Sequence, residues 1–346
     1  MRVGVDGKSL QPPREGVARY LEGVLAGCAA LKVPDLELDV ITPSRPKRRL
    51  PWVLWDMQRA TARGFDAFHF PFYYPPLMPR CPVTVAIHDV LPLEHPEWFG
   101  RRWSNTLRWM IPAGAKRATA VVTGAEATAE AIVSSCSIAR AQIRVIPYGV
   151  DAGLFAPVPA EGIASVRHQL GLGRPYLLQL GALERRRGVD LALAATEMLR
   201  VRWPELELVL AGERRTDISA LAAASAWVRR LGRVEEAALP ALYAGAAAVL
   251  APSRGEGFDF PVLEALACGA LVVASDISVH VEHFAAAVRM FPSGDAQALA
   301  DAVAVVLDDS AAAAALRARG PAHAARFSWK ESARRHIELW REVAGR

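Results

Sequence analysis

Short apolar runs alternate along the chain with longer segments in which apolar residues recur every three or four positions. The first helical pattern runs from Val17 through Leu21 and Val24 to Leu31. Strand-like runs occupy 3–5, 38–41, 65–70, 83–87, 120–123 and 143–147. Because a strand is followed by a helix each time, the pattern predicts a parallel, doubly wound sheet of the α/β class.

A break in this alternation divides the chain in two. The turn-forming residues of a linker lie between 151 and 175, namely Pro157, Pro159, Gly162, Gly171, Gly173 and Pro175. Strand-like runs then resume at 176–180, 206–211, 247–251 and 271–274. We therefore predict two Rossmann-like domains, 1–156 and 157–327. The segment 328–346 has the spacing of an amphipathic helix, and we expect it to pack back on the first domain.

Composition restricts the class of protein further. Hydrophobic residues make up 52% of the chain and charged residues 22%, as in ordinary α/β proteins. No apolar run approaches the roughly 18–20 residues of a membrane span, and the first ten residues lack the apolar core of a signal peptide. We expect a cytoplasmic protein. The cysteines are far apart and lack zinc-ligand spacing, so we expect buried thiols.

The net charge of +5 comes entirely from the first half of the chain. Up to Phe155 there are 19 Lys and Arg against 14 Asp and Glu, whereas the remainder has 22 of each kind. Two interpretations stay open: simple solubility, or an acidic partner such as a phospholipid surface, a lipid pyrophosphate or an anionic glycan. The segment 45–55 combines four basic residues with Trp52 and Trp55. It fits an ordinary surface or a peripheral contact at the inner face of a membrane.

The strongest chemical signal lies in 253–269. A strand-like run is followed by a loop with two glycines, and Pro261 then suits the first turn of a helix. Glu256 and Asp259 are therefore placed near a helix N-terminus, which offers free backbone N–H groups to an anion or to hydroxyls. Glu264 follows about one turn into the helix. The carboxylates of Glu256 and Glu264, aimed at one crevice, suit a polyhydroxylated ligand.

This segment resembles the signature of the retaining glycosyltransferases of family 4 (GT4), Glu-Gly-Phe-Gly-x-Pro-x-x-Glu-Ala-x-Ala-x-Gly. The resemblance implies that Glu256 meets the transferred hexose and that Glu264 holds the nucleotide ribose. It also implies that the backbone at Phe258, Asp259 and Phe260 contacts sugar hydroxyls and phosphate. One departure is that Asp259 stands where the family usually has glycine.

A second match is the segment 176–188, whose strand-like start leads to Gly181 and then to three consecutive arginines. Cations beside a helix N-terminus suit a diphosphate leaving group. The segment resembles the family's Gly-x-Leu-Glu-x-Arg-Lys motif, so the resemblance places Arg186 and Arg187 on the phosphates, with Arg187 in the position of the usual lysine. Ala182 replaces another phosphate-binding arginine of part of the family.

Three further positions follow from the same resemblance. His88 comes just after the run 83–87, where parallel sheets bind ligands, and it matches the histidine that approaches the donor sugar. Gly16 matches a glycine that lets backbone approach the phosphates. Val234 lies at the strand end that binds the base. The aromatic residues after His69 are open to two interpretations, stacking on an acceptor or packing in the core.

The resemblance implies a GT-B fold, in which two Rossmann-like domains with parallel sheets face each other across a cleft. It implies transfer of a hexosyl group from a GDP- or UDP-sugar to a glycan or lipid-linked acceptor. No Asp-x-Asp motif and no phosphate-binding P-loop occur in the sequence. The missing Asp-x-Asp motif predicts that no metal is required, and we expect no other cofactor and no nucleic-acid partner. A sugar-nucleotide epimerase on the same fold, or a non-catalytic sugar-nucleotide-binding protein, remains an alternative.

Overall fold

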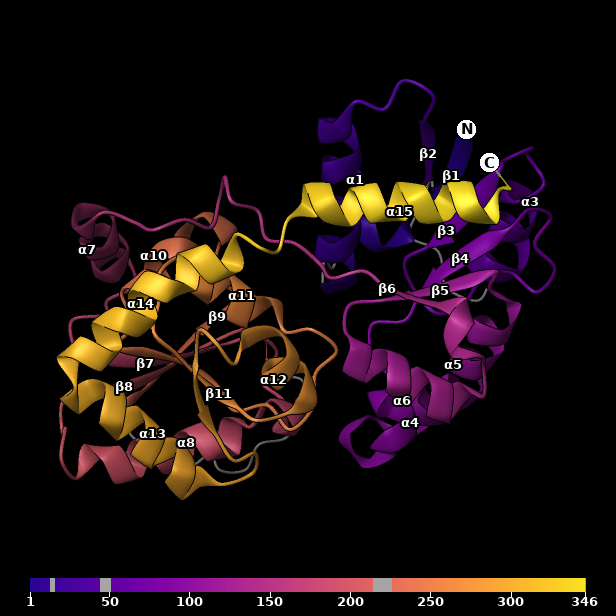
Figure 1. The fold of residues 1–346 in the computed structure, drawn as a ribbon. Helices are drawn as coiled ribbons and strands as arrows, with labels where there is room; N and C mark the ends of the chain where they lie inside the picture. The colour runs from indigo at the N-terminus through magenta and orange to yellow at the C-terminus, as the bar shows by residue number, and fades with distance from the viewer. Residues whose placement is uncertain (13–15, 44–50, 214–225, 346) are drawn as a thin grey trace. The chain divides into compact units, whose positions relative to one another are not determined.

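The computed structural model describes residues 1–12, 16–43, 51–213 and 226–345, with helices and strands as in Figure 1. Contacts divide the chain into two compact units. Unit 1 consists of Met1–Gly149 together with Phe327–Arg346, and unit 2 of Val150–Arg326. Residues 150–156, which the linker pattern assigned to the first domain, thus belong with unit 2. Phe155 is buried there, with its ring 6.4 Å from that of Tyr243.

Unit 1 contains a six-stranded parallel sheet in the order β2-β1-β3-β4-β5-β6. Its strands are β1 (Arg2–Asp6), β2 (Glu37–Ile41), β3 (Ala67–Phe70), β4 (Val83–Ala86), β5 (Ala120–Thr123) and β6 (Ile143–Val145). The central strands β3, β4 and β5 are buried along their whole length. They therefore read as continuous apolar runs, as expected of a sheet covered on both faces.

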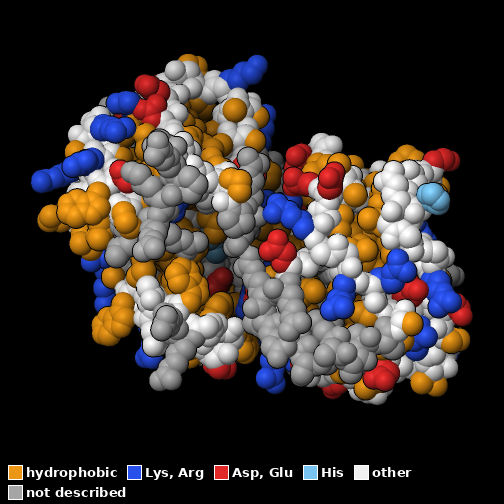
Figure 2. All heavy atoms as spheres, turned by 180° about the vertical axis from the view of Figure 1, so that it is seen from behind, with side chains coloured by type: hydrophobic (Ala, Val, Ile, Leu, Met, Phe, Trp, Pro, Cys, Tyr) orange, Lys and Arg blue, Asp and Glu red, His pale blue; other side chains and the backbone are white. Residues whose placement is uncertain are grey.

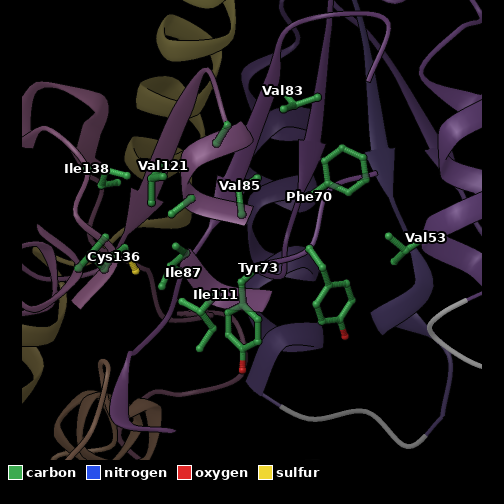
Figure 3. Packing of buried hydrophobic residues seen from close by; sticks show 14 of the residues in the cluster. Val53, Phe70, Tyr73, Val83, Val85, Ile87, Ile111, Val121, Cys136 and Ile138 are labelled. Atoms are coloured by element: carbon green, nitrogen blue, oxygen red, sulfur yellow. The ribbon is translucent and has the colours of Figure 1, made fainter. Parts of the chain in front are cut away.

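Helices and short turns surround this sheet. They are η1 (Lys8–Leu10), α1 (Gly16–Leu31), the π-helix η2 (Trp52–Met57), α3 (Gln58–Ala60), α4 (Leu91–Glu94), η3 (Pro96–Trp98), α5 (Arg101–Arg117), α6 (Glu126–Cys136), η4 (Arg140–Gln142) and α15 (Trp329–Val343). Figure 3 shows part of the core, where Phe70 and Tyr73 lie beside Val85 and Ile111. The aromatic segment after His69 is therefore mainly core.

Unit 2 repeats the architecture with the strand order β12-β11-β10-β7-β8-β9, again all parallel. The strands are β7 (Tyr176–Leu180), β8 (Glu207–Ala211), β9 (Val228–Gly232), β10 (Ala248–Ala251), β11 (Val272–Ser275) and β12 (Arg289–Phe291). The helices are α7 (Ala160–Gln169), η5 (Arg185–Arg187), α8 (Val189–Arg200), η6 (Glu236–Ala238), α10 (Leu239–Ala244), α11 (Phe260–Ala267), α12 (Ser278–Phe284), α13 (Ala296–Asp308) and α14 (Ser310–Ala324). Both units are thus Rossmann-like.

The C-terminal helix α15 packs on α1 within unit 1 (Figure 1). Two glycines of α1 make room for it. A Cβ atom on Gly23 would lie 2.1 Å from the ring of Trp329, and one on Gly27 would lie 2.2 Å from the Trp329 carbonyl oxygen. Larger residues at these positions would separate the helices, so close packing here depends on the missing side chains.

A chain of buried hydrogen bonds crosses from α15 into the sheet. His336 Nδ1 is 2.8 Å from the Ser332 carbonyl oxygen, and its Nε2 is 2.8 Å from the Tyr20 hydroxyl. Tyr20 in turn contacts His69 Nε2 at 3.1 Å, and His69 Nδ1 contacts the Thr84 hydroxyl at 2.9 Å. Because a carbonyl only accepts, His336 donates from Nδ1 and accepts from Tyr20. Every donor then meets an acceptor while both histidines stay neutral.

The surface carries exposed large hydrophobic side chains among charged ones, as the face in Figure 2 shows. Among the described residues of unit 1 they are Trp55, Leu77, Met78, Trp103 and Trp109. Trp52, grouped with Trp55 in the sequence analysis, is instead only 3% exposed and donates to Asp6. The basic residues Arg45, Lys47, Arg48 and Arg49 lie outside the described ranges. Within those ranges, no helix is long and apolar enough to cross a membrane.

The buried histidines predict that acid destabilises unit 1. Burial lowers the pKa of His336 to about 4, whereas an unfolded histidine has a pKa of about 6.5. The unfolded state therefore binds more protons between these values, so stability is full above about pH 6.5 and falls as the pH drops toward 4. At pH 5 this one histidine should cost about 2 kcal/mol of unfolding free energy.

Urea unfolding at pH 7 and pH 5 tests this, followed by tryptophan fluorescence because seven of the nine tryptophans belong to unit 1. His336→Gln should lower stability at pH 7 but shrink the difference between the two pH values. His168 is exposed, so His168→Gln is the control and should leave the difference unchanged. An equal pH dependence in His336→Gln and the natural chain would contradict a neutral His336.

Candidate functional site

The candidate site lies where the strand order of unit 2 reverses. The chain runs from β7 outward to β8 and β9, and from β10 outward to β11 and β12, while β7 and β10 are neighbours. Loops that follow two such strands diverge and leave a crevice at the carboxyl edge, the usual ligand position in open α/β sheets. The loops after β7 and β10 carry Arg186, Arg187, Glu256 and Asp259, and the structure brings these side chains together.

Backbone geometry fixes the two loops against each other. Gly188 has φ +67°, and a Cβ atom there would lie 2.0 Å from the Pro252 carbonyl oxygen. The backbone N–H of Arg254 donates to the Arg186 carbonyl oxygen at 2.8 Å. The Arg254 guanidinium also donates two hydrogen bonds to the Asp190 carboxylate, at 2.9 and 2.8 Å. The loops are therefore held by one close approach and by paired hydrogen bonds before any ligand binds.

Glu256 is the centre of the charged network. Arg186 Nη1 donates to Glu256 Oε2 at 2.9 Å and to the Gly255 carbonyl oxygen at 2.9 Å. Arg187 Nη1 lies 3.3 Å from Glu256 Oε1, which also accepts from the Ser253 hydroxyl at 2.9 Å. The Glu256 side chain is only 5% exposed. One buried carboxylate thus holds two consecutive guanidinium groups, as strong charge-assisted hydrogen bonding allows.

Asp259 lies at the start of α11 in the left-handed region, with φ 72° and ψ 74°. Its Oδ2 is 3.1 Å from His280 Nε2, and its Oδ1 is 3.6 Å from Arg187 Nη1. Burial alone would raise the pKa of Asp259. The hydrogen bond from His280 and the charges of Arg187 and Arg186 outweigh burial and hold this pKa below its usual value.

The other predicted residues of unit 2 are more enclosed. Glu264 is 2% exposed, and its Oε2 accepts from the Tyr243 hydroxyl at 3.0 Å. The Phe258 ring packs beside His283 and Phe284, so it is a core side chain, while Phe260 is half-buried. Val234 follows β9 and is half-buried. Phe258, whose backbone the family resemblance assigns to the ligand, thus also packs its ring in the core of unit 2.

His88 and Gly16 belong to unit 1. His88 follows β4, and both of its ring nitrogens are engaged. Nε2 donates to the Pro71 carbonyl oxygen at 2.9 Å, so Nδ1 accepts from the Tyr148 hydroxyl at 2.7 Å. Burial lowers the pKa of His88 to about 4, although the bond to Pro71 opposes this shift. His88 is therefore neutral near pH 7. Gly16 begins α1, is exposed, and has open space where a Cβ would be.

A small cavity of about 10 Å³ lies beneath the site, lined by residues that include Gln179, Arg187, Ser253 and Asp259. Its volume suits about one water molecule and excludes a sugar or nucleotide.

Three residues that contact the predicted site residues were not predicted from the sequence. His280 belongs to α12, 21 residues beyond Asp259, and no motif singled it out. Ser253 lies inside the recognised segment but had no assigned role. Tyr243 is a lone tyrosine in an apolar helix, which usually indicates core packing. Only the fold shows that each one meets a predicted carboxylate.

Family models match both halves of the chain. The sequence model of the family described as "Glycosyl transferases group 1" matches residues 174–309, and that of "Glycosyltransferase Family 4" matches residues 16–154. The chain is 26% identical over 304 residues to O-antigen chain mannosyltransferase B of Escherichia coli, covering 85% of this chain and 77% of that protein. It is 32% identical over 224 residues to D-inositol 3-phosphate glycosyltransferase of Corynebacterium urealyticum, covering 59% of this chain. The chain spans about half the length of that second relative.

Solved structures show the fold. Anabaena HepE, crystallised with UDP and glucose, matches with a TM-score of 0.78 at 19% identity, covering 98% of this chain and 99% of that one. WaaG, a glycosyltransferase involved in lipopolysaccharide biosynthesis, matches with a TM-score of 0.74 at 16% identity and the same coverage. The architecture is thus GT-B. With both halves matched by related family models, the chain belongs to the group 1 glycosyltransferases of family 4.

Proposed function

We propose that this protein transfers a hexosyl group from a GDP- or UDP-sugar to an acceptor hydroxyl with retention, in glycan or glycolipid synthesis. The observation that carries the proposal is the pair Arg186 and Arg187, held by Glu256 at the β7/β10 switch point. Two guanidinium groups at a ligand edge suit a diphosphate, which accepts paired hydrogen bonds from each.

The same pair supports a mechanism without a metal ion. Negative charge grows on the diphosphate as the bond to the sugar breaks, and positioned cations stabilise that charge most in the transition state. Arg187 precedes Gly188 and the start of α8, so the N-terminus of a 12-residue helix adds its positive end. The arginines are already ordered by Glu256, which leaves little reorganisation for the reaction step.

Glu264 of unit 2 and His88 of unit 1 are each assigned a further contact with the donor in this proposal. The Tyr243 hydroxyl orients the Glu264 carboxylate, which can then accept from ribose hydroxyls. His88 is neutral and already uses both nitrogens. Its assigned contact with the donor sugar therefore requires that one hydrogen bond, to Pro71 or from Tyr148, is exchanged when the donor binds.

The acceptor side is assigned to unit 1, where α5 offers a surface for acidic or lipid-linked molecules. The sequence of α5 contains five basic residues and no acidic one. Leu107 and Ile111 face the core, while Trp103 and Trp109 are 40% and 82% exposed. Asn105, Arg108 and Trp109 line a surface hollow. Arg108 and Trp109, exposed and lining the same hollow, favour peripheral contact with an anionic membrane surface.

Incubation with radiolabelled UDP- and GDP-sugars, with and without EDTA, tests the activity. We expect transfer to an acceptor hydroxyl that persists in EDTA. Loss of transfer in EDTA, restored by Mg²⁺ or Mn²⁺, would contradict the leaving-group mechanism. Isomerisation of the sugar without an acceptor would instead identify an epimerase, and binding without turnover a binding protein.

Glu264 should govern nucleotide affinity. Glu264→Ala removes charge-assisted hydrogen bonds to the ribose and should weaken binding of UDP or GDP by about 1–3 kcal/mol. Calorimetric titration measures this change. Tyr243→Phe keeps the carboxylate and removes only the hydroxyl that orients it, so its effect should be smaller. Unchanged affinity in folded Glu264→Ala would remove the ribose role.

Arg187 should act on kcat. An interaction that strengthens as the leaving group departs lowers kcat when lost, whereas uniform binding changes KM. Arg187→Ala should reduce kcat on the order of a hundredfold or more, comparable to the loss of one oxyanion donor. Arg187→Lys restores the usual family residue and should retain substantial activity. A normal kcat with a raised KM would transfer the role to Arg185 or Arg186.

Membrane contact through α5 should depend on charge. Co-sedimentation with vesicles of phosphatidylcholine and phosphatidylglycerol should exceed that with phosphatidylcholine alone, and it should fall as salt rises. Trp109→Ser and Arg108→Ser should each weaken it, whereas Arg319→Ser on an exposed position of α14 should not. Absent binding at low salt, with good turnover of a neutral soluble acceptor, would exclude this surface.

A further inference from the structure

The position of Asp259 is unfavourable for an aspartate in two respects. Its backbone is left-handed, with φ 72°, a conformation that glycine adopts without strain and aspartate only at a cost. Its carboxylate is also buried, with the residue 6% exposed, and a buried charge requires compensation. Two unfavourable features at one residue beside the proposed diphosphate site indicate that the side chain is held by specific partners.

Those partners are His280 and Arg187. His280 is fully buried, and its Nε2 lies 3.1 Å from Asp259 Oδ2. Asp259 Oδ1 accepts no hydrogen bond among the described residues, and Arg187 Nη1 lies 3.6 Å from it. One carboxylate therefore bridges a histidine of α12 and the arginine that we assign to the leaving group.

Hydrogen-bond direction fixes how many protons this pair holds. His280 Nδ1 is 2.9 Å from the Ser275 carbonyl oxygen, which can only accept. A neutral imidazole has one N–H, and Nδ1 uses it. The contact from Nε2 to a carboxylate oxygen requires a second proton, shared between His280 and Asp259. Arg187 lies 3.6 Å from the other carboxylate oxygen of Asp259 and favours its ionised form, so the geometry describes an imidazolium beside a carboxylate.

Charge balance gives this proton a consequence for an anionic ligand. Among the described residues, the ion pairs around Arg187 join three cationic groups, Arg186, Arg187 and protonated His280, to three carboxylates, those of Glu184, Glu256 and Asp259. If His280 lost its proton, the network would carry one excess negative charge. That charge would lie beside the arginines that are to receive a diphosphate, and it would repel the ligand.

We propose that Asp259 and His280 form a positioning pair for Arg187, in which Asp259 anchors the guanidinium and His280 cancels the added negative charge. The inference rests on the proposed function, because it assumes that Arg187 meets the diphosphate of the donor. It also explains why two departures from the usual motif, arginine for lysine at 187 and aspartate for glycine at 259, lie in contact. The guanidinium of Arg187, which is wider than a lysine ammonium, has the Asp259 carboxylate as a partner. That carboxylate in turn has the buried cation of His280 as its partner.

A double-mutant cycle tests the pair, with UDP and GDP binding measured by calorimetry and unfolding measured in urea. His280→Gln leaves Asp259 charged without its cation, so affinity should fall at least tenfold. Asp259→Asn removes the carboxylate that anchors Arg187 but leaves no unpaired charge, and asparagine tolerates the left-handed backbone, so affinity should fall by less than in His280→Gln. The combination D259N/H280Q restores the charge balance and should bind within about threefold of Asp259→Asn. The unfolding free energies should show the same recovery.

His283→Gln is the matched control, because His283 is also a buried histidine of α12 but lies beside Phe258 and Glu282. Its effect should add to that of Asp259→Asn without recovery. Equal loss of affinity in His280→Gln and D259N/H280Q, or full affinity in folded His280→Gln, would overturn the pair while the natural chain still binds nucleotide. A natural chain that binds neither UDP nor GDP would overturn the proposed function as well.

Discussion

A single buried carboxylate, that of Glu256, sets the arrangement of the ligand edge of unit 2. Two consecutive arginines carry like charges and would repel each other if no anion lay near both. Glu256 meets one through each of its oxygens, so the loop after β10 must approach the loop after β7. Gly188 permits that approach, since any side chain there would collide with Pro252. Gly188, the β7/β10 switch point and the Glu256 carboxylate therefore together determine how closely the two loops approach.

The apolar pattern predicted the interior strands because both of their faces are covered. β7, β8, β10 and β11 coincide closely with the expected runs, and nearly every residue in them is buried. The edge strands β9 and β12 gave no comparable run. β9 has two arginines in five residues and is at most half-buried, and β12 has only three residues. In unit 1 the edge strands β2 and β6 did give apolar runs, at 38–41 and 143–147, so an edge strand is predicted by hydrophobicity only where its own residues are apolar.

The site was predictable to the extent that it depends on local sequence. Glu256, Asp259 and the arginines lie in two short segments whose spacing reports a strand, a turn and a helix start. Partners of the predicted residues come from elsewhere in the chain: His280 of α12 meets Asp259, Tyr243 of α10 meets Glu264 and, in unit 1, Tyr148 meets His88. A lone histidine has the same appearance in the sequence whether its ring is free or satisfied. Only tertiary contacts distinguish the neutral His88 from the histidine beside Asp259.

The two units use buried polar groups in opposite ways. In unit 1, Tyr20, His69 and His336 form a neutral chain in which each donor already has its acceptor. This hydrogen-bond chain is not suited to bind an anion. Each of its donors would have to leave its present acceptor, and none of its groups carries a positive charge. In unit 2 the cations are held by carboxylates, and a guanidinium has five N–H donors, so each arginine can keep its carboxylate and still donate to an anion. The charged network is therefore the part of the chain suited to the diphosphate of the proposed donor.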